Sequence, residues 1–352
     1  MRAKLDEILK MSDAVMLTSP HNLRYFSGFK GGEGVCVIGK AFAYLFVDSR
    51  YTIQAKLEAP DFNVIEFGGG KLLDEILSVL NIRHIKTLAF EDADMSVASF
   101  ERYKDKFDGI SFIGKSKEIN LQRMIKTQDE IDFIRKAEHI GDIAFNNVLP
   151  LIKSGVAEIE IAAELEYQMR KNGADGIAFE TIVVSGAKSG MPHGKPDGKK
   201  LEVGDFVTMD FGCTASGYCS DMTRTVVIGK ANEEQVKIYN TVLSAQLAAL
   251  NSLRAGITGK DADDVARNII KEAGYGNNFG HSLGHGVGLL IHELPNLSPL
   301  SNITLEENMV VTCEPGIYIE NFGGVRIEDT IVIKNGGIEN LTTSPKEIII
   351  CS

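Results

Sequence analysis

Residues 149–173 read LPLIKSGVAEIEIAAELEYQMRKNG, and residues 250–274 read LNSLRAGITGKDADDVARNIIKEAG. In both stretches the end of an apolar helix is followed by a basic residue, a glycine, a turn, an amphipathic helix and a second glycine. The two glycines are 18 residues apart in each copy. This repetition predicts a duplicated unit of two helices and a strand hairpin, and therefore a domain with pseudo-twofold symmetry around a central sheet.

The first copy continues into a predicted hairpin that carries two acidic residues. Apolar and polar residues alternate over positions 206–211, with Asp210 on the more polar face of the expected strand. A two-residue turn at Ala215-Ser216 would place Asp210 directly opposite Asp221 on the returning strand. Opposite positions on paired strands lie about 5 Å apart, where like charges destabilise the sheet. We therefore expect positive charge between these carboxylates.

The second copy carries a matching pair of acidic residues, Glu314 and Glu328. A turn centred on Asn321 would place these two residues opposite each other. Counted from the first glycine of each copy, the acids lie at 55 and 66 residues in the first and at 58 and 72 in the second. If the pseudo-twofold axis brings the pairs together, protonation, basic side chains or cations could relieve their repulsion. Two divalent ions match four carboxylates better than one ion does.

Histidines near the expected acids complete a candidate metal site. Residues 280–288 read GHSLGHGVG, in which four glycines allow close approach of the backbone and a histidine can supply one imidazole ligand. Four carboxylates and one imidazole favour manganese, cobalt or iron(II), allow zinc, and exclude a cysteine-rich structural zinc site. Two such ions with a bridging hydroxide indicate metal-assisted hydrolysis. His193 and His292 occupy comparable places in the two copies and are candidates for substrate binding and oxyanion stabilisation.

The composition is that of an ordinary globular chain of about two domains. The 352 residues are 44% hydrophobic and 24% charged, and 37 Lys and Arg against 48 Asp and Glu leave a net charge of −11. This charge argues against nucleic acid and anionic membranes as partners. No apolar run approaches the roughly 18 residues of a membrane span, and Asp6 and Glu7 interrupt the N-terminus where a signal peptide is apolar. We expect a cytoplasmic protein whose five scattered cysteines are buried thiols.

The first third of the chain predicts a small α/β domain over residues 1–119. Helical spacing is expected in four segments: Lys4–Met11, Ser49–Ala59, Lys71–Leu80 and Val97–Phe107. Strands are expected in three segments: Gly34–Ile38, Ala43–Val47 and Thr87–Phe90. A capping box at Thr127–Glu130 begins the first long helix of the second domain, residues 120–352.

Five motifs in the chain resemble the metallopeptidases of the pita-bread fold, which include methionine aminopeptidase, aminopeptidase P and prolidase. These motifs are MPHGKPDGKKLEVGDFVTMDFG (191–212), GYCSDMTRT (217–225), GHSLGHGVGLLIHELP (280–295), VTCEPGIY (311–318) and GGVRIEDT (323–330). The likeness covers essentially the whole chain, because aminopeptidase P and prolidase also carry an N-terminal domain of this size. The resemblance implies an α+β fold: a small α/β N-terminal domain, then a pseudo-twofold pita-bread catalytic domain with a central, mainly antiparallel curved sheet.

The resemblance also implies a role for each matching metal ligand. Asp210 is similar to the chelating ligand of one ion, and Asp221 and Glu328 are similar to the carboxylates that bridge two ions. His285 and Glu314 resemble the ligands of the second ion. Glu314 also matches the residue that handles the proton of the attacking water.

Five further residues match positions around the substrate in similar enzymes. His193 and His292 correspond to residues that contact the substrate or the tetrahedral intermediate. His281 precedes the histidine ligand by four residues, as it does in aminopeptidase P. Arg326 and Tyr318 match a pair that hydrogen-bonds a ligand carboxylate, and such partners orient metal ligands.

The complete ligand set favours an active peptidase over a non-catalytic, peptide-binding relative. The N-terminal domain and His281 argue against methionine aminopeptidase, which leaves cleavage between a first residue and proline. In some similar prolidases an arginine that binds the carboxylate of the dipeptide follows the histidine equivalent to His292. Residues 292–296 read HELPN here, with no base. We therefore expect an aminopeptidase P that uses two divalent ions, most simply Mn²⁺, with prolidase as the alternative.

The resemblance further implies a homodimer or a higher homo-oligomer. The segment Gly31–Gly34 is expected to form a hairpin turn, and the alternative is a loop that reaches the site of a neighbouring subunit.

Overall fold

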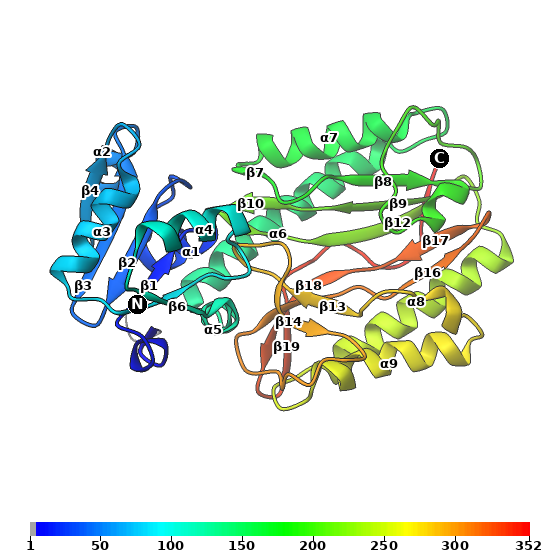
Figure 1. The fold of residues 1–352 in the computed structure, drawn as a ribbon. Helices are drawn as coiled ribbons and strands as arrows, with labels where there is room; N and C mark the ends of the chain where they lie inside the picture. Colours follow the sequence, from blue (N-terminus) through cyan, green and yellow to red (C-terminus); the bar gives the residue numbers. More distant parts are fainter. Residues whose placement is uncertain (1–4) are drawn as a thin grey trace. The chain divides into compact units, whose positions relative to one another are not determined.

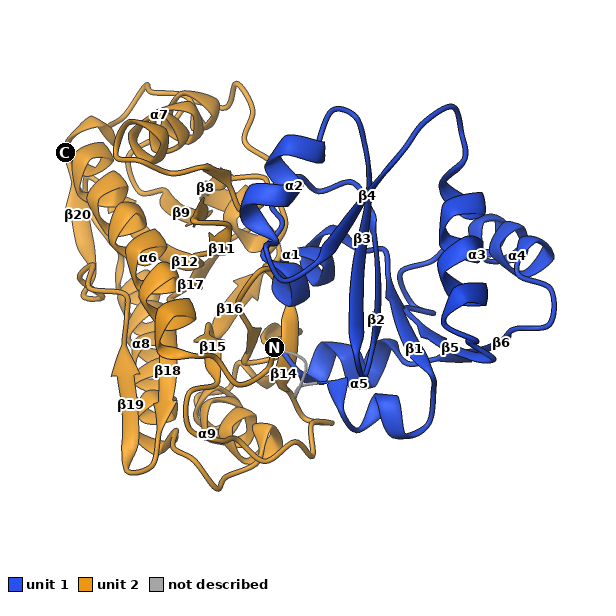
Figure 2. Ribbon diagram, turned by 90° about the vertical axis from the view of Figure 1, so that its left-hand side faces the viewer, with its two compact units in different colours: residues 1–123 blue, residues 124–352 orange. Residues whose placement is uncertain are grey.

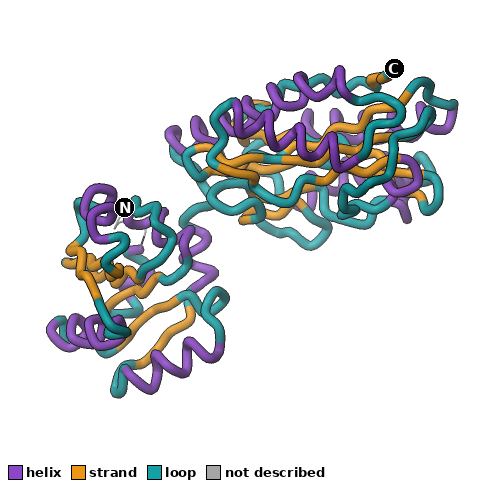
Figure 3. Tube along the Cα trace, turned by 90° about the horizontal axis from the view of Figure 1, so that it is seen from above, coloured by secondary structure: helices purple, strands orange, loops and turns teal. Residues whose placement is uncertain are grey.

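The structure is a computed structural model that describes residues 5–352. It divides into two compact units, Met1–Arg123 and Met124–Ser352 (Figure 2). The first unit reaches Arg123, four residues past the expected end at residue 119 and beyond helix α5 (Ser116–Leu121), because the guanidinium of Arg123 donates to the side chain of Asn22 in the same unit. Both units contain helices and strands, so the fold is α+β (Figure 3). No helix within residues 5–352 is long and apolar enough to cross a membrane.

A six-stranded mixed sheet forms the centre of the first unit, with the strand order β4-β3-β2-β1-β5-β6 (Figure 1). Its strands are β1 (Ala14–Leu17), β2 (Val35–Gly39), β3 (Phe42–Asp48), β4 (Asn63–Phe67), β5 (Thr87–Phe90) and β6 (Ser111–Gly114). Besides α5, the helices of the first unit are α1 (Pro20–Ser27), α2 (Thr52–Glu58), α3 (Leu72–Ile82) and α4 (Val97–Lys106). Hydrophobic clusters cover both faces: Val15 of β1 packs in one and Met16 in the other.

Most of the elements predicted for this unit are present. The three expected strands are β2, β3 and β5, and three of the expected helices are α2, α3 and α4. The helix expected over Lys4–Met11 is wrong in its described part, which forms only a short 3-10 helix at Ile8–Lys10; Lys4 lies outside the described residues. Strand β1 is not predicted from the sequence, because it is buried at every position and therefore lacks the alternation of a half-buried strand.

Two helix pairs flank the strands of the second unit (Figure 1). The pairs are α6 (Gln128–Val148) with α7 (Glu158–Lys171), and α8 (Glu233–Ser252) with α9 (Gly259–Glu272). The first helix begins with the predicted capping box of Thr127 and Glu130. The strands form two main sheets, ordered β20-β12-β9-β8 and β14-β13-β15-β18-β19. Every pairing within them is antiparallel except β12 with β20.

The strands of this unit have the following bounds. The first main sheet contains β8 (Ile182–Ser185), β9 (Phe206–Phe211), β12 (Met222–Ile228) and β20 (Ile349–Cys351). The second contains β13 (Gly284–Gly286), β14 (Glu293–Leu297), β15 (Val310–Cys313), β18 (Asp329–Lys334) and β19 (Gly337–Asn340). Short ladders join β7 (Gly176–Ile177), β10 (Cys213–Ala215) and β11 (Tyr218–Cys219), and separately β16 (Gly316–Ile319) and β17 (Gly323–Arg326).

The predicted duplication appears in matching backbone contacts. The N–H of Gly155 donates to the carbonyl oxygen of Leu201 at 2.8 Å, and the N–H of Gly256 donates to that of Leu305 at 2.8 Å. The φ angles of these glycines are +87° and +95°, a region that residues with a Cβ rarely adopt. The two halves therefore use the same glycine turn to connect their helix pairs, which confirms the pseudo-twofold organisation.

The register predicted for the first hairpin is wrong by a shift of its turn. The turn lies at Ser216-Gly217, with φ angles of +49° and +71°, rather than at Ala215-Ser216. Hairpin turns of this kind need positive φ at both central positions, and glycine satisfies the second one. Asp210 consequently pairs with Thr223 and not with Asp221. Asp221 lies between β11 and β12, just before the returning strand begins.

The register predicted for the second hairpin agrees with the structure. β16 and β17 pair Gly316 with Arg326, and beyond them Cys313 pairs with Asp329. Both ladders have the same register, which is centred on Asn321, and the φ angle of Asn321 is +59°. Glu314 and Glu328 lie between the two ladders, in the opposed positions that the sequence predicts.

Candidate active site

A cavity of about 1090 Å³ lies in the second unit, and every predicted site residue lines it. Acidic and histidine side chains occupy one part of its wall, and apolar residues such as Ile159, Phe179 and Ile291 occupy another. The predicted residues among its lining are His193, Asp210, Asp221, His281, His285, His292, Glu314, Tyr318, Arg326 and Glu328. A pocket with both an apolar wall and converging polar groups is typical of a site for a small ligand.

Strand ends from both halves bring the five predicted metal ligands together. Asp210 lies on β9, His285 on β13, and Glu314 directly after β15. Nε2 of His285 lies 3.3 Å from Oε1 of Glu314 and 3.5 Å from Oδ2 of Asp221. Asp221, His285 and Glu328 each offer a ligand atom, and these atoms lie within 4.8 Å of one another. The spacing is short enough for one ion to contact ligands from both halves.

Like charges and burial disfavour the ionised form of two of these carboxylates. Burial and the charge of Glu328 raise the pKa of Asp221 well above its usual range. Burial and the charges of Glu314 and Asp210 likewise raise the pKa of Glu328. Burial also opposes ionisation of Glu314, but its hydrogen bond with His285 and the positive charge of that ring outweigh burial and lower its pKa to about 2. Carboxylates forced together in this way favour either protons or cations between them.

The donor set fits divalent metal ions. Oδ1 of Asp210 is buried and has no hydrogen-bond partner among the described residues, whereas Oδ2 accepts a hydrogen bond from Arg326 at 2.6 Å. A buried carboxylate oxygen without a partner is costly unless a cation or water satisfies it. Four carboxylates face one guanidinium and one imidazole here, and hard oxygen ligands with one nitrogen suit first-row divalent ions.

A chain of hydrogen bonds connects Asp210 to His281. Arg326 donates to Asp210 and also, at 2.8 Å, to the hydroxyl of Tyr318. The Tyr318 hydroxyl lies 2.9 Å from Nε2 of His281, and Nδ1 of that ring lies 2.8 Å from the carbonyl oxygen of Ser282. Because a carbonyl oxygen only accepts, Nδ1 carries the proton and Nε2 accepts from Tyr318. Both nitrogens of His281 are therefore used within the protein.

Two other histidines, His193 and His292, line the cavity. The ring of His292 meets that of His285 edge to face at 4.3 Å between centroids. Burial and the charge of His285 lower the pKa of His292, so this imidazole is neutral at neutral pH. His193 is exposed on the loop that follows β8 and lines the same cavity. Both rings can meet a bound ligand.

Several residues that support the ligands are absent from the sequence prediction. Glu138, fully buried on α6, accepts the backbone N–H of Asp221 at 2.8 Å, and burial raises its pKa to about 8. The Thr223 hydroxyl donates to Glu328 at 2.6 Å, and the Thr312 hydroxyl donates to Glu314 at 3.0 Å. The only sequence signal for Glu138 is an acid at a position of the apolar stripe of its helix, where a charge needs a partner.

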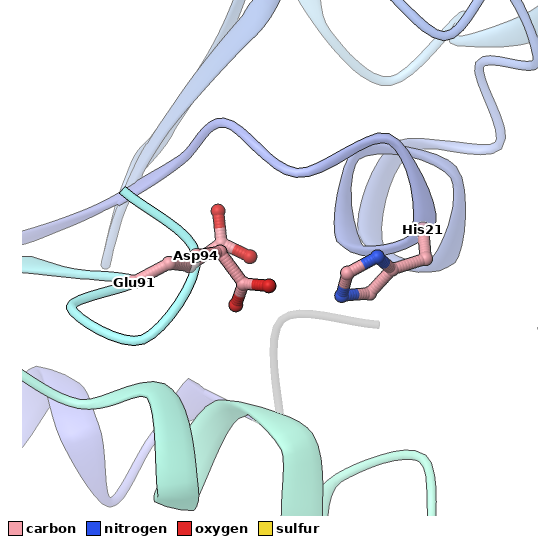
Figure 4. A group of neighbouring side chains, drawn as sticks. All are labelled: His21, Glu91 and Asp94. Atoms are coloured by element: carbon pink, nitrogen blue, oxygen red, sulfur yellow. The ribbon is translucent and has the colours of Figure 1, made fainter. Parts of the chain in front are cut away.

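A second group with metal-ligating side chains occurs in the first unit. His21, Glu91 and Asp94 face one another there (Figure 4). Glu91 is buried, and it already accepts the backbone N–H of Ser19 at 3.0 Å and the amide of Asn22 at 2.6 Å. These bonds satisfy donors at the N-terminus of α1. The carboxylate of Glu91 therefore has a structural task at this helix end.

The cysteines agree with the expectation of buried thiols. All five are buried and none forms a disulfide: Cys36, Cys213, Cys219, Cys313 and Cys351. Burial raises the pKa of the Cys213 and Cys219 thiols to about 12. A thiol that stays protonated is a poor nucleophile and a poor metal ligand.

Acidic and histidine side chains from both halves of a pseudo-twofold α+β unit line one cavity. This arrangement is that of a metal-dependent hydrolase. Residues 132–335 match the metallopeptidase family M24, and residues 2–125 match the creatinase/prolidase N-terminal domain. The chain belongs to metallopeptidase family M24, which confirms the resemblance that its motifs indicate, and enzymes of this family use two metal ions.

Relatives of known name or structure resemble the chain over nearly its whole length. It is 41% identical to the Xaa-Pro dipeptidase of Pyrococcus furiosus, over 99% of the chain and 100% of that protein. The structure of an Xaa-Pro dipeptidase from Bacillus anthracis matches with a TM-score of 0.96 and 43% identity, over 99% of this chain and 98% of that one. The structure of an X-Pro aminopeptidase from Thermotoga maritima matches with a TM-score of 0.92 and 44% identity, over 98% and 99%. These matches confirm the pita-bread fold.

Proposed function

We propose that the protein is an Xaa-Pro dipeptidase, a prolidase that hydrolyses dipeptides with proline as the second residue. Two of the relatives named above are Xaa-Pro dipeptidases that match the chain from end to end. The expectation of an aminopeptidase P depended on the lack of a base after His292. Lys195, on another loop, lines the same cavity, so the lack of a base after His292 does not exclude a dipeptidase. The prolidase alternative is therefore the better proposal.

The observation that carries the proposal is the cluster of four carboxylates, two of them buried, and His285 on one wall of the cavity. We infer that Asp210, Asp221, His285, Glu314 and Glu328 hold two divalent ions, with Mn²⁺ the first candidate and Co²⁺, Zn²⁺ and Fe²⁺ the alternatives. Such ions lower the pKa of bound water and stabilise negative charge on the oxygens of a hydrolytic transition state.

The chain's own residues then divide the remaining tasks. Glu314 is ionised at neutral pH and can take a proton from the attacking water. The exposed rings of His193 and His292 can donate hydrogen bonds to the scissile carbonyl and to the oxyanion that develops from it. Arg326 and Tyr318 fix the carboxylate of Asp210. His281 acts as a positioning residue for Tyr318, because both of its ring nitrogens are occupied.

The apolar part of the cavity suits the proline ring. Phe179, Pro192 and Ile291 line the cavity beside the histidines, and a pyrrolidine ring buries its carbon atoms well against such side chains. Dipeptides are thus accommodated by one polar wall and one apolar wall.

The cellular location and the oligomeric state of the protein are also proposals. We propose a cytoplasmic location and, on the ground of the family resemblance, a homodimer or higher homo-oligomer. The segment Gly31–Gly34 joins α1 to β2, so the expectation of a hairpin turn between two strands is wrong. In that assembly the segment is the candidate for reaching a neighbouring site.

A side-by-side assay tests the proposed function. Metal-stripped protein is supplied again with Mn²⁺ and given an Xaa-Pro dipeptide and an Xaa-Pro-Xaa tripeptide. We expect cleavage of the dipeptide and little cleavage of the tripeptide. Efficient removal of the first residue from the tripeptide would instead establish an aminopeptidase, and inactivity on both with Mn²⁺, Co²⁺ and Zn²⁺ would favour a peptide-binding protein. Glu328→Ala is the control, since it should lose metal binding and activity together.

A further inference from the structure

We propose that Lys195 binds the C-terminal carboxylate of the dipeptide and thereby limits the length of peptide that the site accepts. The inference rests on the proposed dipeptidase function and deepens it. A dipeptide presents a negative charge immediately after its proline, whereas a longer peptide presents a neutral amide at the same place. A correctly placed cation therefore distinguishes the two substrates.

Only two Lys or Arg side chains of the described residues line the cavity, Lys195 and Arg326. Arg326 is buried and its guanidinium is committed to Asp210, Tyr318 and Thr223. Lys195 has an exposed side chain, 75% accessible, that can turn toward a ligand. The cation available to a substrate carboxylate is therefore Lys195.

The backbone on both sides of Lys195 is well anchored. The N–H of Gly194 donates to the carbonyl oxygen of Met191 at 3.0 Å, and a Cβ at Gly194 would come within 2.7 Å of a methyl group of Val184. On the other side, Asp197 pairs with Lys188 at 2.7 Å. The loop thus presents Lys195 two residues after the exposed ring of His193, from a fixed backbone, while its long side chain keeps its freedom.

The neighbours of Lys195 form a place where a carboxylate fits. Its ammonium group lies 2.7 Å from a carboxylate oxygen of Glu180, which is itself 78% exposed and lines the cavity. The next residue, Thr181, also lines the cavity, and its buried hydroxyl has no partner among the described residues. A substrate carboxylate would accept a hydrogen bond from Lys195 in place of Glu180. Glu180 then acts as the counter-ion of Lys195 when no substrate is bound.

Kinetics with matched substrates test this assignment. The substrates are an Xaa-Pro dipeptide and the same dipeptide with a C-terminal amide, and the variants are Lys195→Met and Lys195→Arg. Because a charge-assisted hydrogen bond is lost, we expect Lys195→Met to raise the KM for the dipeptide about tenfold, with kcat nearly unchanged. The KM for the amide should stay the same, and Lys195→Arg should restore most of the preference for the dipeptide.

Lys200→Met is the matched control. Lys200 lies on the same loop and forms a similarly exposed ion pair, with Glu160 at 3.2 Å, but neither residue lines the cavity. This variant should leave both KM values unchanged. Glu180→Gln provides a test in the opposite direction: removal of the counter-ion should lower the KM for the dipeptide, because Glu180 no longer competes for Lys195.

The possible results separate this inference from the proposed function. If the native protein cleaves the dipeptide and Lys195→Met leaves its KM unchanged, or raises both KM values equally, Lys195 does not recognise the carboxylate and the inference is wrong. If the native protein fails on the dipeptide but cleaves the tripeptide, the proposed function fails and takes the inference with it.

Discussion

Replacing Asp329 by Asn should strongly destabilise the second unit. Asp329 is fully buried and pairs with Arg224, itself 1% exposed, at 2.8 Å, and it also accepts from Lys346 at 2.6 Å. The substitution keeps the shape of the side chain but leaves two cations beside an uncharged amide. Breaking a buried ion pair from one side costs about 3–5 kcal/mol. For a unit of this size each kcal/mol lowers Tm by about 2–4 °C, so we expect a decrease of about 6–20 °C.

Thermal unfolding followed by circular dichroism measures this change, and an exposed pair supplies the control. Asp264 pairs with Lys260 along α9, and both side chains are more than 40% exposed. Asp264→Asn should therefore cost less than about 1 kcal/mol. Asp329→Asn should also weaken metal binding, because Arg224 donates to the carbonyl oxygen of Glu328, next in the chain. Equal decreases of Tm in the two variants would refute the argument from burial.

Three further predictions concern the cavity and the thiols. Arg326→Met should reduce metal affinity or kcat about 10–100-fold, as measured by metal titration and steady-state kinetics, because Asp210 loses the partner that orients it; an unchanged affinity and rate would contradict this role. In metal-stripped protein the pKa values of Asp221 and Glu328 are raised, so between weakly acidic and neutral pH the folded state holds protons that the unfolded state releases. Tm should therefore fall as the pH rises over this range. Added Mn²⁺ should abolish the fall. A rise of Tm over that range would contradict this prediction. A thiol reagent should label the native protein slowly and the unfolded protein fully, and rapid native labelling would show that these cysteines are accessible: Cys36, Cys213, Cys219, Cys313 and Cys351.

The sequence predicts the site better than it predicts the local geometry. Repeated glycines and matched acids place Asp210, Asp221, Glu314 and Glu328 in one cavity, because a duplicated topology brings equivalent strand ends to the same point. The register of the first hairpin could not be deduced in the same way. It depends on which two residues adopt positive φ, and Ser216-Gly217 competes with Ala215-Ser216 for that position.

Supporting contacts between distant parts of the chain escape sequence reasoning for a different reason. Glu138 and the Asp221 backbone are 83 residues apart, and a helix pattern says only that Glu138 faces the interior. Lys195 looks like a member of an ordinary solvated basic loop, and only the folded cavity shows that it reaches the same space as His292. Burial of a charge can be predicted from periodicity, but the identity of its partner requires the tertiary structure.

One proposed ligand of each half is held by a side chain of the other half. Arg326 of the second half holds Asp210 of the first, and Thr223 of the first half holds Glu328 of the second. During synthesis, Asp210 therefore emerges 116 residues before Arg326, the group that orients it. The site is therefore complete only after both halves have folded against each other.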